Sequence, residues 1–203
     1  EKSGLMNSLS QWVLNEACRQ FAQWRQRGFT LPSVSVNLSP TDFHNLKLPQ
    51  YLEAILRSHG MLPGDLLIEI TEGVLMDSNP NVMRTLNEIR ALGVRLSIDD
   101  FGTGYSSLAY LRNLPVNELK LDQSFVHDLG RDRSTRALTN AVMHIGDSMG
   151  LLVVAEGVEH STQRNLLKAQ GYQIVQGNLF SPPLPPEELE NWLDENMSFT
   201  QWQ

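Results

Sequence analysis

The feature that most constrains the fold is a repeated order of elements: an amphipathic stretch, a glycine, and then a short run of β-branched residues. Glycine readily adopts the left-handed conformation that ends an α-helix, so each such glycine marks a helix end before a strand. Helical periodicity predicts helices at residues 6–27, 48–59, 79–93, 134–149, 161–170 and 187–196. The apolar runs predict strands at residues 33–38, 66–71, 95–99, 118–122, 151–156 and 173–176.

Strands that alternate with helices at this spacing indicate parallel βαβ units, either in a doubly wound sheet or in a (β/α) barrel. No glycine-rich phosphate loop follows an early strand, whereas polar and acidic residues end strand after strand. We therefore predict an α/β fold of the TIM-like barrel type. A barrel of this type has eight strands, so we expect the first two to precede residue 1. Residues 1–203 then form one N-terminally incomplete domain, with residues 197–203 as a tail.

The composition excludes several classes of protein. A net charge of −7 and an isoelectric point near 5.2 argue against a surface that follows a long nucleic acid, which requires clustered basic residues. The single cysteine, Cys18, excludes a disulfide framework or a cysteine-based zinc site within the chain. No apolar run approaches the roughly 20 residues that span a bilayer. We predict a cytoplasmic domain, with a membrane anchor left open for a longer parent protein.

Polar side chains gather where the predicted strands end. Side chains alternate along a strand, so residues two apart share a face, and strand ends of a closed barrel converge at one mouth. Five strands contribute a polar residue at or near the carboxyl end: Asn37, Glu69, Asp99, Glu156 and Gln176. Asp100 adds a further carboxylate beside Asp99, and Lys120 adds a positive charge.

Carboxylates that converge in this way repel one another unless cations lie among them. Oxygen ligands without histidine or cysteine favour Mg²⁺ or Mn²⁺. Two such ions bridged by a carboxylate, for which Asp99 is the natural candidate, can drive in-line displacement at a phosphoester. Lys120 could face a phosphate oxygen or the attacking water. A single acidic residue at a strand end is more often a helix cap or a lysine partner, so the prediction rests on the coincidence over five strands.

Six segments carry a resemblance to a known family: VNLSP (36–40), IEITE (68–72), DDFGTGYSSL (99–108), LKLD (119–122), VVAEGVE (153–159) and QGNLFSPPLP (176–185). Together they resemble the EAL-domain cyclic di-GMP phosphodiesterases, and the similarity runs over nearly the whole chain. The long DDFGTGYSSL segment is the most specific of the six.

The resemblance implies a role for each matching residue. Asn37, Glu69 and Asp99 would hold one metal ion, and Asp99, Asp100 and Glu156 would hold the second. Lys120 would lie beside the attacking water, and Glu72 would steady the loop formed by residues 101–107. The further candidates for substrate binding or loop stabilisation are Gln176, Glu159, Asp122, Thr103 and Ser106.

The implied reaction is hydrolysis of cyclic di-GMP to linear pGpG with two Mg²⁺ or Mn²⁺ ions. The EAL tripeptide, whose glutamate is a metal ligand in the family, is expected upstream of residue 1, so the activity is assigned to the full-length parent. That parent would carry sensor or GGDEF-type domains, and the open strand edges favour a homodimer. Two alternatives stay open: a silent cyclic di-GMP receptor, and an unrelated barrel metalloenzyme that uses a strand-end lysine as base.

Overall fold

The computed structural model describes residues 2–76, 79–104 and 108–196 of the chain. This part contains a six-stranded sheet in which consecutive strands are neighbours and every pair is parallel. The strands are β1 (Val34–Leu38), β2 (Leu66–Thr71), β3 (Arg95–Phe101), β4 (Glu118–Leu121), β5 (Leu152–Ala155) and β6 (Ile174–Val175). All six predicted strands are therefore confirmed, with ends that differ by one or two residues.

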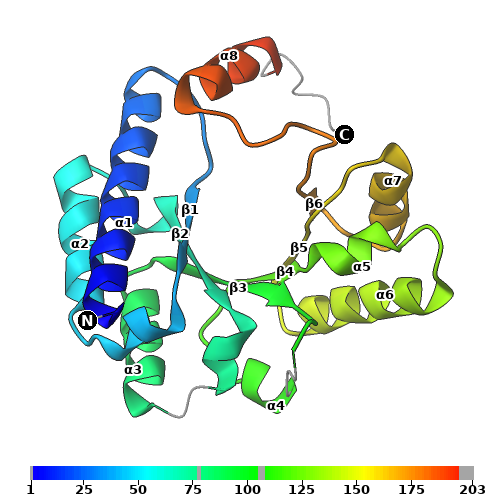
Figure 1. Ribbon diagram of the computed structural model, residues 1–203, viewed down its shortest axis with the longest axis horizontal. Helices are drawn as coiled ribbons and strands as arrows, with labels where there is room; N and C mark the ends of the chain where they lie inside the picture. Colours follow the sequence, from blue (N-terminus) through cyan, green and yellow to red (C-terminus); the bar gives the residue numbers. More distant parts are fainter. Residues whose placement is uncertain (1, 77–78, 105–107, 197–203) are drawn as a thin grey trace.

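Helices cover the outside of the curved sheet (Figure 1). The long ones are α1 (Lys2–Gln26), α2 (Leu48–His59), α3 (Pro80–Ala91), α6 (Arg133–Ser148), α7 (Ser161–Ala169) and α8 (Pro186–Asn196). Five short elements were not predicted: η1 (Pro40–His44), η2 (Pro63–Asp65), η3 (Glu72–Met76), α4 (Leu108–Leu111) and α5 (Gln123–His127). Their brevity explains this, because one or two turns carry too little periodicity to be recognised in a sequence.

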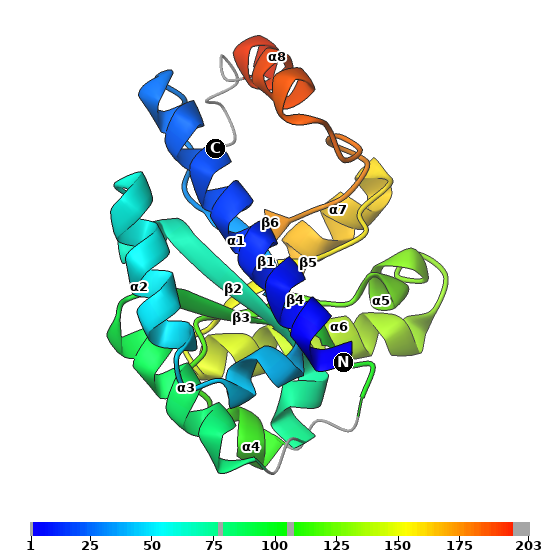
Figure 2. The same ribbon diagram turned by 60° about the vertical axis from the view of Figure 1, so that its left-hand side comes forward.

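The strand order decides between the two candidate architectures. A doubly wound sheet reverses its strand order at a switch point and carries helices on both faces. Here the order runs from β1 to β6 without reversal, and both views place the helices around one side of a curved wall (Figures 1 and 2). The α/β, TIM-like prediction is confirmed. In the described part of the chain, β1 and β6 are the two edges of this wall.

Helix α1 corrects one prediction about the core. Its apolar residues predict one buried face that includes Leu9, Trp12 and Phe21. Phe21 is buried as predicted, but Leu9 and Trp12 are 55% and 64% exposed. Among the α1 residues whose burial the structure describes, the other buried ones are Leu14 and Cys18, which continue the face of Phe21 at a spacing of about one helical turn. The helix has apolar residues on more than one side, and only the position of the sheet and α2 selects the buried one.

Helix α8 lies beside the C-terminal end of α1 in both views (Figures 1 and 2). Glu190 of α8 accepts a hydrogen bond of 3.1 Å from the indole N–H of Trp24 and forms an ion pair with Arg27. These polar contacts tie the last described helix to the first. Within the described residues, no helix is both long enough and apolar enough to cross a bilayer.

Candidate active site

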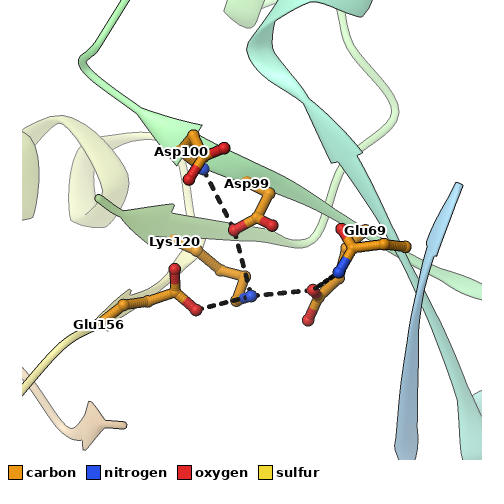
Figure 3. A network of polar contacts seen from close by, with 6 residues as sticks. Glu69, Asp99, Asp100, Lys120 and Glu156 are labelled. Carbon is orange, nitrogen blue, oxygen red and sulfur yellow. Dashed lines mark hydrogen bonds and ion pairs between the residues drawn. The ribbon is translucent and has the colours of Figure 1, made fainter. Parts of the chain in front are cut away.

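Lys120 is the centre of a charged network at the carboxyl ends of the strands (Figure 3). Its ammonium nitrogen lies 2.9 Å from Glu69 Oε2, 3.1 Å from Asp99 Oδ1 and 2.7 Å from Glu156 Oε1. The Lys120 side chain is only 7% exposed. A lysine of this burial requires anionic partners. Here three strands other than its own supply a carboxylate near the carboxyl end: Glu69 and Asp99 lie two residues before the ends of β2 and β3, and Glu156 directly follows β5.

Strand register explains how Asn37 joins this network. Asn37 of β1 pairs directly with Glu69 of β2, so the two side chains extend from the same face at the same level. The Asn37 amide donates a hydrogen bond of 3.0 Å to Glu69 Oε2, the oxygen that also accepts from Lys120. Side-chain alternation in the sequence predicted this juxtaposition.

Asp99 and Asp100 are adjacent, so regular alternation would send them to opposite faces of β3. Two irregularities prevent this: the pairing of β3 with β4 shifts register between Ile98 and Phe101, and Asp100 has a positive φ of 55°. Oxygen atoms of Asp99, Asp100 and Glu156 consequently lie within 4.8 Å of one another. A positive φ in a residue other than glycine destabilises the folded state by on the order of 1 kcal/mol or more. Backbone strain of this kind is typical of functional sites.

The surroundings change the pKa values of the central groups. Burial would lower the pKa of Lys120, but hydrogen bonds to Glu156 and Glu69 outweigh burial and raise it. Burial raises the pKa of Glu156 despite its bond to Lys120. Burial also raises the pKa of Asp100, with help from the negative charges of Asp99 and Asp122. The ammonium stays protonated, while the carboxyl groups carry mutual repulsion that a cation would relieve.

Glu72, at the start of η3, contacts the loop after β3. Its Oε2 accepts hydrogen bonds of 3.1 Å from the backbone N–H groups of Gly102 and Gly104. The approach is so close that a Cβ on Gly104 would lie 2.7 Å from Glu72 Oε1. The loop that follows Asp99 and Asp100 is thus held by a carboxylate that comes directly after β2, the neighbouring strand.

Two other predicted residues act within their own loops. Asp122 caps α5, because its Oδ1 accepts a hydrogen bond of 2.9 Å from the Ser124 N–H and another from the Ser124 hydroxyl. Burial acts to raise the pKa of Asp122, but these hydrogen bonds outweigh it and lower the pKa. The Thr103 hydroxyl donates to the Asp100 carbonyl oxygen at 2.9 Å. Ser106 lies outside the described residues.

Gln176 and Glu159 are exposed and lie beyond the network around Lys120. The main chain of Gln176 joins the loops, since its N–H donates to the Ala155 carbonyl oxygen and its own carbonyl oxygen accepts from Val158. Glu159 lies on the wall of a cavity lined by Gln123, Ser124, His127, Asp128, Gly157 and Glu159. Among the described residues, no hydrogen bond or ion pair joins either side chain to the carboxylates around Lys120.

Sequence reasoning missed one buried polar residue near the site, Gln163 of α7. Its side chain is bonded to backbone groups of the loop before α7 and of helix α5, and the residue is 5% exposed. The signal in the sequence is a glutamine three residues after His160, a spacing typical of a residue that caps its own helix. That spacing predicts the local contact but not the hydrogen bond to Val126 in α5.

The donor atoms fit divalent cations of the Mg²⁺ or Mn²⁺ type. Among the described residues the network sets one ammonium against the carboxylates of Glu69, Asp99, Asp100 and Glu156, so it stays anionic. Apart from the Lys120 ammonium, the described side chains of this network are carboxylates and the Asn37 amide, whose oxygen atoms are ligands that these ions prefer. The acidic group of Asp99, Asp100 and Glu156 could hold a metal ion.

Comparison with protein families gives a match to the EAL domain model over residues 1–183. The chain is 40% identical over 193 residues to the oxygen sensor protein DosP of Escherichia coli. The matched region covers 95% of this chain and 24% of DosP. The chain is 39% identical to the cyclic di-GMP phosphodiesterase NbdA of Pseudomonas aeruginosa, over 95% of the chain and 25% of NbdA. The chain therefore spans about a quarter of the length of these relatives.

Solved structures agree with the family match. The phosphodiesterase of MucR in complex with cyclic di-GMP has a TM-score of 0.87 and 40% identity, over 93% of this chain and 76% of that chain. The EAL domain of Mycobacterium smegmatis DcpA also has a TM-score of 0.87, with 34% identity, over 94% of this chain and 86% of that chain. Both neighbours share the curved parallel sheet described above.

Proposed function

The chain belongs to the EAL domain family, and on that premise we propose that its full-length parent hydrolyses cyclic di-GMP to linear pGpG with the help of two Mg²⁺ or Mn²⁺ ions. The observation that carries the proposal is the convergence of Glu69, Asp99 and Glu156 on the buried Lys120 ammonium. A purely structural ion pair would need one carboxylate, and the excess negative charge is suited to cations that bind a phosphodiester.

Two overlapping sets of residues would hold the cations. Asp99, Asp100 and Glu156 form the tighter set, because their oxygen atoms lie within 4.8 Å of one another. Asn37, Glu69 and Asp99 form the second set, joined through the Asn37 amide and through Lys120. When bound, such ions offset the charge that develops on the attacking and leaving oxygens of the phosphoester.

Lys120 supplies a fixed positive charge beside these carboxylates. In the hydrolysis a water oxygen bonds to phosphorus, one ribose P–O bond breaks, and the departing oxygen gains a proton. A protonated lysine near the phosphorus stabilises the extra negative charge on the phosphoryl oxygens. The raised pKa of Lys120 also speaks against the barrel enzyme that uses a strand-end lysine as base, since such a base needs a lowered pKa.

The remaining predictions about the whole protein stand as part of this proposal. They are a cytoplasmic location, a parent with sensor or GGDEF-type domains, and a homodimer. The oxygen sensor name of DosP and the bifunctional cyclase name of MucR support a multidomain parent. Thr103, Gln176 and Glu159 at the rim of the site are proposed to contact or frame the dinucleotide.

The test incubates the purified protein with cyclic di-GMP and Mn²⁺ and separates the nucleotides by chromatography. We expect pGpG to accumulate, and chelation of the metal with EDTA to stop its formation. The second candidate function, a silent receptor, predicts that cyclic di-GMP binds and is recovered unchanged. Recovery of intact dinucleotide with Mn²⁺ present would therefore replace the enzyme proposal by the receptor.

A further inference from the structure

The side-chain amide of Gln163 makes hydrogen bonds in two directions. Its Oε1 accepts from the backbone N–H groups of Glu159 and His160, at 2.9 Å and 2.8 Å. Its Nε2 donates to the carbonyl oxygen of Val126, at 3.1 Å. With a residue exposure of 5%, these bonds form where water competes little.

The two segments that Gln163 joins lie next in sequence to residues of the candidate metal site, Glu156 and Lys120. Glu159 and His160 lie in the loop that follows β5 and begins with Glu156. Val126 belongs to α5, the short helix that follows Lys120 and is capped by Asp122. The amide therefore connects the loop of one rim carboxylate to the element that immediately follows the central lysine.

Close packing at a second point makes this connection rigid. Gly157 has a φ of 70°, and a Cβ built on it would lie 2.4 Å from the Cβ of Gln123, the first residue of α5. On its other side α5 packs Phe125 against Gly102, where a Cβ would lie 2.9 Å from the ring. Helix α5 thus touches both rim loops, and Gln163 fixes it to one of them.

We propose that Gln163 is a positioning residue of the metal site, whose amide holds Glu156 at the distance from Lys120 and Asp99 that cation binding requires. The inference rests on the proposed function and adds a residue that acts through the loop without touching the metal. Partners of this kind typically change metal affinity 10- to 100-fold when they are altered.

Two substitutions separate the bridge from a merely local role. Gln163→Glu keeps an oxygen that accepts from Glu159 and His160, so the start of α7 remains capped, but it loses the N–H that donates to Val126. Gln163→Met has a similar size and loses both functions. If Gln163 only caps α7, the glutamate variant binds Mn²⁺ at least as tightly as the unchanged protein, because it keeps the cap and its added negative charge attracts cations. If Gln163 bridges the two segments, both variants bind Mn²⁺ more weakly.

The matched control is Gln170, the residue that ends α7 on the side away from the rim. Its amide also bridges two groups, accepting from the Thr139 hydroxyl at 2.9 Å and donating to the Arg136 carbonyl oxygen at 3.0 Å. Gln170→Met removes a bridge of the same chemistry between α7 and α6. It should lower the melting temperature without changing the affinity for metal.

The experiment measures Mn²⁺ affinity by calorimetry for the unchanged protein and for the three variants, with hydrolysis of cyclic di-GMP as a second readout. We expect Gln163→Glu and Gln163→Met to weaken Mn²⁺ binding by about 10-fold or more, with hydrolysis partly restored at high Mn²⁺. Circular dichroism reports whether each variant is folded. If Gln163→Met does not fold, the Mn²⁺ affinity of Gln163→Glu alone decides between the two roles.

Mn²⁺ affinity in Gln163→Glu equal to or above that of the unchanged protein would overturn the inference. So would an equal loss in Gln170→Met. Failure of the proposed function looks different, because the unchanged protein would then bind Mn²⁺ and leave cyclic di-GMP intact, while the comparison of affinities would still decide the role of Gln163.

Discussion

Asp99 and Asp100 lie near the end of β3, Glu156 begins the loop after β5, and two chemically different side chains hold the loops that follow these two strands. The loop after β3 is held by the carboxylate of Glu72, which accepts from the N–H groups of Gly102 and Gly104. The loop after β5 is held by the amide of Gln163, which accepts from two N–H groups and donates to a carbonyl oxygen of α5. Both side chains are buried.

The difference follows from what each group can bond. A carboxylate accepts only, and its bonds to N–H groups are charge-assisted and strong, so it suits a glycine loop with free N–H groups. An amide both donates and accepts, so it can join two segments, at lower strength per bond and without adding charge. A second buried carboxylate beside Glu156 would add repulsion to a site that is already acidic.

The largest expected effect tests the premise that the two loops matter because they hold the carboxylates of Asp99, Asp100 and Glu156 in place. Asp99→Asn should lower turnover of cyclic di-GMP by several orders of magnitude, because an amide is a poor bridge between two cations. The measurement is the initial rate of pGpG formation at saturating Mn²⁺. Asp147→Asn, on the exposed face of α6, is the control and should leave the rate unchanged. Turnover of Asp99→Asn within tenfold of the unchanged protein would remove Asp99 as the bridge.

The second expected effect concerns Glu72, the carboxylate that holds the loop after β3. Glu72→Ala should reduce the rate on the order of 100-fold, since a displacement of about 1 Å in a positioned group has that effect. Glu72→Gln keeps one acceptor oxygen and loses the charge, so its loss should be smaller. The measurement is the rate as a function of Mn²⁺ concentration.

Glu88→Ala is the control for this series, because the side chain of Glu88 forms an ion pair with Arg84 on the surface of α3. Rates and metal dependence of Glu72→Ala that match those of Glu88→Ala would show that the loop after β3 holds its shape without Glu72. Equal losses in the alanine and glutamine variants would show that charge, rather than hydrogen bonding, is the decisive property.

The smallest expected effect concerns the loop after β5, which the uncharged amide of Gln163 holds. Gly157→Ala places a methyl group 2.4 Å from the Gln123 Cβ, which pushes the loop after β5 away from α5. We expect Mn²⁺ affinity to fall by about tenfold, as for a lost outer partner of a metal site. Calorimetric titration with Mn²⁺ measures this directly.

Gly150→Ala separates the collision from the backbone effect. Gly150 has a φ of 68°, close to the 70° of Gly157, and a Cβ built on it meets no atom within 4 Å. Both variants carry a similar strain of roughly 1–2 kcal/mol for a left-handed alanine, seen as a lower melting temperature. A loss of Mn²⁺ affinity in Gly150→Ala as large as in Gly157→Ala would attribute the effect to stability alone.

Much of the fold was predictable because it depends on local chemistry. Alternation of helical and strand periodicity located the six strands, and glycine marked the helix ends, as at Gly60, which is left-handed with a φ of 65°. The carboxyl-end residues Asn37, Glu69, Asp99, Lys120 and Glu156 could be grouped because side chains two apart in a strand share a face. The rim contacts of Asp122 and Thr103 depend on turns too short to leave a pattern.

The sequence by itself determined the order of elements, the parallel sheet and the identity of the acidic residues, because periodicity and strand ends are local properties of the chain. Tertiary structure decided which side of α1 is buried, how Asp100 turns toward Asp99, and which loop Gln163 reaches. Each of these depends on a neighbour distant in sequence: the sheet and α2 for Trp12, the shifted pairing with β4 for Asp100, and the Val126 carbonyl oxygen for Gln163. Such contacts form only when the sheet and its helices are assembled, since the same side chain could form a local hydrogen bond in another fold.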